Sequence, residues 1–145
     1  MNNTAMFSCK IGTTDAAANL GMEIWLDQEQ IFNVDHVKEI IEFTHEFAEA
    51  DAEHELQFRM KNKTIEHTRV DEGNNIVHDA SLTITDVAFE EIDLGHMLVE
   101  QTEYTHDFNG TQAEITEKFY GEMGCNGTVS LKFTTPIYLW LLEHM

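Results

Sequence analysis

Apolar and polar residues alternate in the last third of the chain, within residues 119–142. An Asn126-Gly127 pair, which favours the positive φ angles of a tight turn, comes first. After it, Val129, Leu131 and Phe133 occupy every second position. Because apolar residues with this period line one face of a β-strand, the pattern predicts a turn followed by a half-buried strand.

The same two-residue period predicts strands at residues 22–26 and 54–64. In the second of these, Leu56, Phe58 and Met60 face one way. The opposite face carries a polar, mostly basic series: Gln57, Arg59, Lys61 and Lys63. The segment therefore reads as a strand with one face in a core and one basic face.

Residues 34–48 fit two periods. A helical stripe would consist of Val37, Ile40, Ile41, Thr44, Phe47 and Ala48. A strand face would consist of Ile41, Phe43, His45 and Phe47. The β-branched and aromatic content, and the short length before the acidic loop that follows, favour the strand.

The apolar positions change parity within residues 81–89. Leu82 and Ile84 are even, whereas Val87 and Phe89 are odd. A slip of one residue moves the side chains to the other face of a strand, so this change predicts a β-bulge near residues 85–86.

The remaining elements are shorter. Residues 71–75 have the composition of a hairpin turn, and residues 92–99 predict a strand or loop pair around Gly95. Residues 111–118 fit a short helix. Thr135 followed by Pro136 resembles a helix start, so residues 137–144 are expected to form a short terminal helix.

Many short strands with turn signals between them predict an all-β fold, an antiparallel β-sandwich or jelly roll. At 145 residues the chain has the length of a single domain, residues 1–145, with room for a substantial core. The predicted core between the two sheets consists of Leu56, Phe58, Met60, Leu82, Ile84, Val129, Leu131 and Phe133.

The charge is strongly acidic, with 8 Lys and Arg against 27 Asp and Glu, a formal net charge of −19. Such a field repels phosphate backbones, which argues against nucleic acid as a partner. Solubility explains the acidity most simply, while cation binding and mimicry of DNA are alternatives. A DNA mimic would need acidic side chains arranged like the phosphates along a DNA strand. Many acidic residues of this chain instead alternate with core residues.

The chain shows no basic, apolar N-terminal leader and no apolar run of the ~20 residues that span a bilayer. We therefore expect a protein that is not secreted through a signal peptide and has no membrane partner. Cys9 and Cys125 are the only cysteines and are expected to be free thiols.

The acidic loop around residues 46–55 is one candidate metal site. Glu49, Asp51 and Glu53 could offer oxygen ligands to Ca²⁺, although their spacing matches no EF-hand loop. The turn containing Asp71, Asn74, Asn75 and Asp79 has similar potential. The alternative in both places is a solvated loop, with no cofactor.

Catalytic signatures are lacking in the sequence. There is no Gly-rich phosphate loop and no nucleophile elbow, the eight histidines show no zinc-ligand spacing, and no base adjoins Cys125. The expectation is a protein that is not an enzyme.

Two features predict an interface. The basic stripe of Arg59, Lys61 and Lys63 either pairs with acids of its own chain or meets an acidic patch on another copy. The apolar run at residues 137–142, which contains Trp140, either closes the core or docks on a neighbouring subunit. We expect this run to be covered on two sides.

Residues 22–26, 56–70 (LQFRMKNKTIEHTRV), 79–94 and 119–142 resemble small proteins encoded in the genomes of marine tailed bacteriophages. The resemblance implies a structural or accessory protein of the virion, located in the virion or the host cytoplasm. Its partners would be other copies of itself or virion proteins.

The alternation in residues 79–94 (DASLTITDVAFEEIDL) also resembles calcium-dependent carbohydrate-binding modules with a jelly-roll fold. This second resemblance implies glycans as partners, adhesion to a host surface and calcium as a possible cofactor. Exposed aromatic residues would then serve as sugar platforms, the candidates being Trp25, Tyr104, Tyr120 and Trp140.

Overall fold

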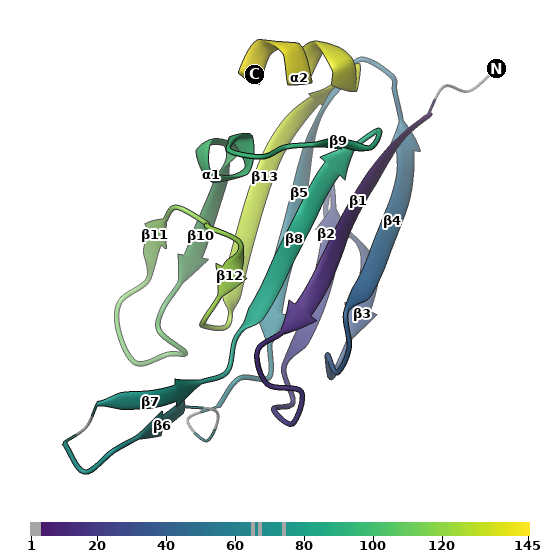
Figure 1. Ribbon diagram of the computed structural model, residues 1–145. Helices are drawn as coiled ribbons and strands as arrows, with labels where there is room; N and C mark the ends of the chain where they lie inside the picture. Colours follow the sequence, from purple (N-terminus) through teal and green to yellow (C-terminus); the bar gives the residue numbers. More distant parts are fainter. Residues whose placement is uncertain (1–3, 65, 67, 74) are drawn as a thin grey trace.

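Two antiparallel β-sheets pack face to face (Figure 1) in the computed structural model, which describes residues 4–64, 66, 68–73 and 75–145. One sheet has five strands: β1 (Thr4–Thr13), β4 (Ile41–Ala48), β8 (Leu82–Phe89), β9 (Ile92–Asp93) and β12 (Glu122–Met123). They follow the order β12-β8-β1-β4, with β9 paired to β8. The predicted antiparallel sandwich is confirmed.

The other sheet has six strands in the order β11-β10-β13-β5-β2-β3. Their bounds are β2 Gly21–Leu26, β3 Glu29–Val34, β5 Ala52–Lys61, β10 Thr102–His106, β11 Ile115–Glu117 and β13 Gly127–Thr135. A separate hairpin of β6 (Thr68–Val70) and β7 (Ile76–Asp79) projects beyond the sandwich (Figure 1). The predicted turn at residues 71–75 joins these two strands, although Asn74 lies outside the described residues.

All eight residues of the predicted core are buried, each with at most 4% of its surface exposed: Leu56, Phe58, Met60, Leu82, Ile84, Val129, Leu131 and Phe133. The register explains this result, because Phe58 of β5 lies opposite Val129 of β13 and Ile24 of β2. Phe7 of the facing sheet packs on Phe58 with ring centroids 6.0 Å apart. Strand parity in the sequence therefore identified the inner faces of both sheets.

The parity slip in β8 is a β-bulge, as predicted. Ser8 of β1 pairs with Ala88, but Lys10 pairs with Thr85, so β8 contains one extra residue. Asp86 takes up the extra length with a φ of 51°. The bulge allows Ile84 and Phe89, which have opposite parity, to be buried together.

The strand alternative for residues 34–48 is also confirmed. Strand β4 buries Phe43 and Phe47 against the core, with Ile41 and His45 partly buried on the same face. Val37 is buried as well, although it precedes the strand, and its backbone N–H donates to the carbonyl of Leu20 at 2.8 Å.

Two local predictions are wrong, and a third, the strand or loop pair at residues 92–99, holds only for β9. Residues 111–118 form no helix, because residues 115–117 pair with β10 as β11. Residues 97–101 form a short helix, α1 (Met97–Gln101), which turns the chain between β9 and β10. Asn126-Gly127 is not a positive-φ turn. Gly127 is needed there because a Cβ would collide with the carbonyl oxygen of Thr105.

The predicted terminal helix is α2 (Ile137–His144), which lies across one end of the sandwich (Figure 1). It buries Ile137, Trp140 and Leu141, whereas Tyr138, Leu139 and Leu142 are exposed. Covering on two sides is therefore not observed. No helix of the described residues is long and apolar enough to cross a membrane.

Candidate functional site

A hollow of about 790 Å³ lies between α2 and one end of the six-stranded sheet. We call it the groove. Its lining comes from the β2–β3 turn, β5, β13 and α2: Asp27, Gln28, Glu53, His54, Glu55, Lys132, Phe133, Thr134, Trp140, Glu143 and His144. Three regions distant in sequence thus meet at one place, because β13 leads directly into α2.

The β2–β3 turn supplies Asp27 and Gln28, both with positive φ, at 51° and 70°. This backbone suits a two-residue hairpin loop. Because β2 pairs with β5, the turn lies beside Glu55. The Glu55 N–H donates to Oδ1 of Asp27 at 2.8 Å, and the Asp27 N–H donates to the Glu55 carbonyl at 2.9 Å. The Asp27 carboxylate is therefore held in a fixed position.

His54 connects this carboxylate to the sandwich interior. Its Nδ1–H donates to Oδ2 of Asp27 at 2.6 Å, and its Nε2 lies 3.2 Å from the hydroxyl of Thr135. The Thr135 hydroxyl donates to the carbonyl of Ala50. Both ring nitrogens of His54 therefore have a polar neighbour, Asp27 on one side and Thr135 on the other.

This arrangement is not a base and nucleophile pair. Thr135 is only 2% exposed, and its hydroxyl hydrogen is donated to the backbone carbonyl of Ala50. A nucleophilic hydroxyl needs a free path to substrate and a base that accepts its proton. His54 and Asp27 therefore shape the groove, and they do not form a catalytic dyad with Thr135.

Aromatic rings form one wall of the groove. The His54 ring stacks on Phe133 with centroids 5.1 Å apart at 26°, and His144 lies 4.7 Å from the ring of Trp140. The His144 Nδ1 contacts the Trp140 carbonyl at 2.7 Å, one helical turn back. Phe133 and Trp140 are buried, so the two imidazoles are the ring surfaces of this wall that remain partly exposed.

The rim of the groove is polar and acidic. Glu53, Glu143, Gln28 and Lys132 are exposed there, while Glu55 accepts a hydrogen bond from the Ser130 hydroxyl at 2.8 Å. Lys132 also lines a second hollow of about 240 Å³, together with Ser130, Glu100, Gln101 and Glu103. Within the described part of the chain Lys132 makes no ion pair, so its ammonium is free to meet a ligand.

The acidic residues expected to bind calcium do not converge. Glu49 accepts a hydrogen bond from the backbone N–H of Ile137, Asp51 is exposed in the loop, and Glu53 lines the groove. Among the described residues no group of three or more His, Cys, Asp or Glu side chains could hold a metal ion. The calcium prediction for this loop thus has no support in the geometry.

The predicted sugar platforms lie in different places. Trp25 is partly buried on the outer face of the six-stranded sheet, where the Arg59 guanidinium covers its ring at 4.4 Å. Tyr104 is 4% exposed, and its hydroxyl contacts the backbone of Cys125. Burial raises the pKa of Tyr104. Tyr120 is 76% exposed, far more than either of the others. Tyr104 is therefore a core residue and not a platform.

The basic stripe pairs within its own chain, which was one of the two predicted outcomes. Lys61 lies 2.9 Å from Asp35 and 3.4 Å from Glu23, and Arg59 contacts Gln57. Lys63 does not belong to the exposed stripe. It lies two residues beyond the end of β5, where the alternation of the strand no longer applies, and it is buried.

Trp140, the fourth predicted interface residue, is 3% exposed and closes the core. Its ring meets Phe89 at 5.9 Å and Phe133 at 6.3 Å, so it joins the two sheets at this end. No pattern in the sequence indicates that Trp140 would line a groove, nor that Asp27 and His54 would meet across 27 positions.

No protein-family model matches the chain, and no curated protein matches it. Two similar solved structures are both vCBM60. The first, vCBM60 in complex with galactobiose, has a TM-score of 0.52 and 10% identity, covering 87% of this chain and 96% of the other.

The second is a selenomethionine form of vCBM60 from work linking two families of calcium-dependent carbohydrate-binding modules by circular permutation. It has a TM-score of 0.50 and 9% identity, covering 88% of this chain and 89% of the other. At such identities the likeness establishes a shared fold. It agrees with the jelly-roll resemblance, while the phage resemblance finds no support here.

Proposed function

We propose that this chain is a non-catalytic carbohydrate-binding module that holds a glycan in the groove between α2 and the six-stranded sheet. The observation that carries the proposal is the groove itself, where exposed polar side chains surround the imidazole rings of His54 and His144, which pack on Phe133 and Trp140. Ligand sites combine an apolar surface with a few placed polar groups in this way. The fold shared with carbohydrate-binding modules supports the same conclusion.

Sugar hydroxyls both donate and accept hydrogen bonds, and the rim provides partners of each kind. Glu53 and Glu143 accept, Lys132 donates, and the Gln28 amide does both. The imidazoles of His54 and His144 offer partly exposed ring surface to the C–H face of a sugar. Each class of contact that a saccharide needs is therefore present in one hollow.

The charge of the groove favours uncharged glycans. Asp27, Glu53, Glu55 and Glu143 outnumber the single lysine, Lys132, and the whole chain carries −19. Sulfated or uronic sugars would be repelled at such a surface. We therefore expect a neutral oligosaccharide as ligand, and adhesion to a glycan-bearing surface as the role that the binding serves.

Isothermal titration with a panel of neutral oligosaccharides, galactobiose among them, tests the proposal. The chain should bind at least one of them, and Lys132→Ala should weaken that binding by about tenfold, since it removes a charge-assisted hydrogen bond. Lys118→Ala, which removes an exposed lysine outside the groove, is the matched control. The assignment would be overturned if no oligosaccharide of the panel bound, or if both variants lost the same amount of affinity.

A further inference from the structure

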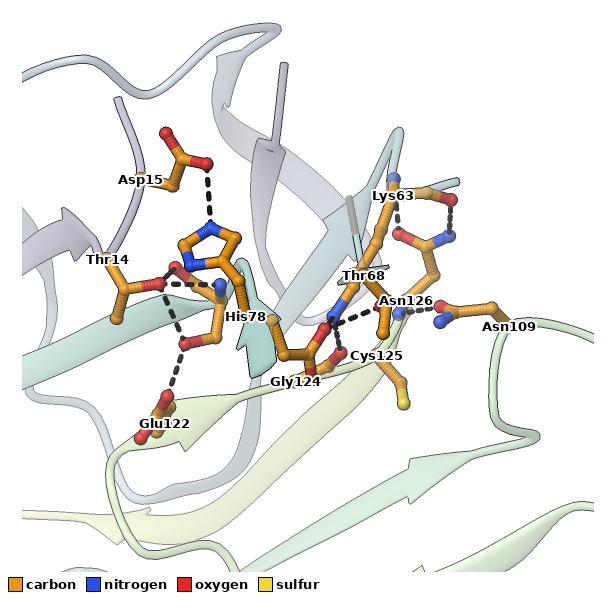
Figure 2. A network of polar contacts seen from close by, with 12 residues as sticks. Thr14, Asp15, Lys63, Thr68, His78, Asn109, Glu122, Gly124, Cys125 and Asn126 are labelled. Atoms are coloured by element: carbon orange, nitrogen blue, oxygen red, sulfur yellow. Dashed lines mark hydrogen bonds and ion pairs between the residues drawn. The ribbon is translucent and has the colours of Figure 1, made fainter. Parts of the chain in front are cut away.

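The ammonium of Lys63 lies among oxygen atoms (Figure 2), just beyond the end of β5 that is remote from α2. The side chain is 1% exposed. Its Nζ donates to Oδ1 of Asp79 at 2.5 Å and also to the carbonyl of Gly124. Thr68 donates its hydroxyl hydrogen to the same Asp79 oxygen at 2.7 Å. A buried cation thus joins the end of β7 to the β12–β13 loop.

The backbone of Lys63 is fixed as firmly as its side chain. Asn126 accepts from the Lys63 N–H at 3.0 Å and donates its amide hydrogen to the Lys63 carbonyl at 2.9 Å. The N–H of Asn126 in turn donates to Oδ1 of Asn109 at 2.8 Å. Figure 2 shows these residues converging from separate loops, so the ammonium is the centre of a network and not an isolated surface charge.

Carboxylate, carbonyl and hydroxyl oxygens are the ligand types that Ca²⁺ takes in proteins. Here the carboxylate oxygen of Asp79 and the carbonyl oxygen of Gly124 already accept hydrogen bonds from the Lys63 ammonium. A second cation in contact with them would face the buried ammonium at close range, and like charges at such a distance repel. Calcium therefore does not fit this position while Lys63 occupies it.

We propose that Lys63 acts as an internal cation that cross-links the loops at this end of the sandwich, in the place of a calcium ion. The loop end of this chain is consequently held together without metal, unlike a calcium-dependent module. This inference concerns metal dependence and loop stability, and it stands or falls independently of glycan binding in the groove.

Thermal melting of the full chain in excess calcium chloride and in excess EDTA is the first test. The proposal predicts the same Tm in both. Lys63→Met should lower the Tm by about 3–6 °C, because it removes the hydrogen bonds that join Asp79 to Gly124 while the Asp79 carboxylate, 39% exposed, remains hydrated. A wild-type Tm that rises in calcium and falls in EDTA, or a Lys63→Met variant that melts like wild type, would overturn the inference.

Lys63→Ala provides the second test, since it removes the ammonium and leaves space among the same oxygens. Calcium or methylammonium chloride should raise the Tm of Lys63→Ala, but not that of Lys63→Met, whose side chain fills the space. Lys61→Ala, which removes a partly buried paired lysine two residues away, controls for general salt effects. Equal responses in Lys63→Ala and Lys61→Ala would contradict the proposal. Should Lys63→Ala fail to fold, the wild-type comparison in calcium and EDTA still decides.

Discussion

The carboxylate of Glu49 accepts a hydrogen bond from the backbone N–H of Ile137 at 2.8 Å. Ile137 is the first residue of α2, and the preceding Pro136 provides no side-chain cap. The first N–H groups of a helix have no partner within the helix, and a negative charge there also complements the helix dipole. The acidic loop between β4 and β5 therefore stabilises the terminal helix.

Replacing Glu49 should weaken the attachment of α2. Glu49→Ala is expected to lower the free energy of unfolding by about 1 kcal/mol, the usual worth of a helix cap. Urea denaturation followed by circular dichroism measures the change. Glu46→Ala is the matched control, because Glu46 is an exposed acid on β4 away from the helix start. Equal urea midpoints for both variants would show that Glu49 does not cap α2.

The two faces of α2 should differ sharply in their response to truncation. Trp140→Ala is expected to cost about 3–5 kcal/mol, because Trp140 fills the end of the core against Phe89 and Phe133. Leu142→Ala, at a residue with 69% exposure, should change stability by less than about 0.5 kcal/mol.

Deleting residues 137–145 should accordingly abolish cooperative folding, as seen by size-exclusion chromatography and thermal melting. A soluble, cooperatively melting truncation that had lost only self-association would show that α2 is an interface element and not part of the core.

Strand parity explains how much of this fold was predictable. Leu131 and Phe58 alternate with polar neighbours because each strand has one face in the core, and that pattern is visible without any knowledge of strand order. The bulge at Asp86 was predictable for the same reason.

Two expectations remain predictions. One is that residues 1–145 form a single domain, and the other is that the protein is located in a virion or the host cytoplasm.

The groove and the Lys63 network could not be predicted in this way. Asp27 meets His54 only because β2 lies beside β5, and Lys63 meets Gly124 only because the β12–β13 loop crosses between the sheets. Such contacts depend on strand order, which parity does not encode. Lys63 does not face outward as the alternation predicts, because β5 ends at Lys61 and the two-residue period of the strand does not continue to Lys63.

Asp15 should contribute a pH-dependent part of the stability. A hydrogen bond from the His78 ring, and then one from the Ala17 N–H, hold the pKa of Asp15 below its usual 3.8. In the unfolded chain the carboxylate takes up its proton nearer 3.8, so the unfolded state binds more protons in this window. The stabilisation is therefore complete at neutral pH and is lost as the pH falls below 3.8 and through the lower pKa that Asp15 has in the folded protein.

Urea midpoints of wild type and Asp15→Asn, compared from about pH 6 to about pH 3, measure this contribution. The difference between the two proteins should be largest at the upper end and shrink below about pH 4. Asp51→Asn, in an exposed loop, should show no such trend. A difference independent of pH would contradict the assignment.

The two thiols should react slowly in the folded protein. Burial raises the pKa of Cys9 to about 12, and burial also raises the pKa of Cys125. Because the thiolate is the reactive form, a thiol reagent such as DTNB should label neither residue readily at neutral pH. Both should react at once in urea. Rapid labelling of Cys9 without denaturant would show that β1 is not buried as described.

Mapping a bound oligosaccharide by two-dimensional ¹H–¹⁵N NMR tests the central claim most directly. On titration with a neutral oligosaccharide, we predict that the largest amide shifts occur at groove residues such as Gln28, Glu53, Lys132 and Glu143. The β6–β7 hairpin at the other end should be unaffected. Shifts centred on another surface, such as the outer sheet face around Trp25, or no shifts with any neutral sugar, would contradict the claim that the groove is a glycan-binding site.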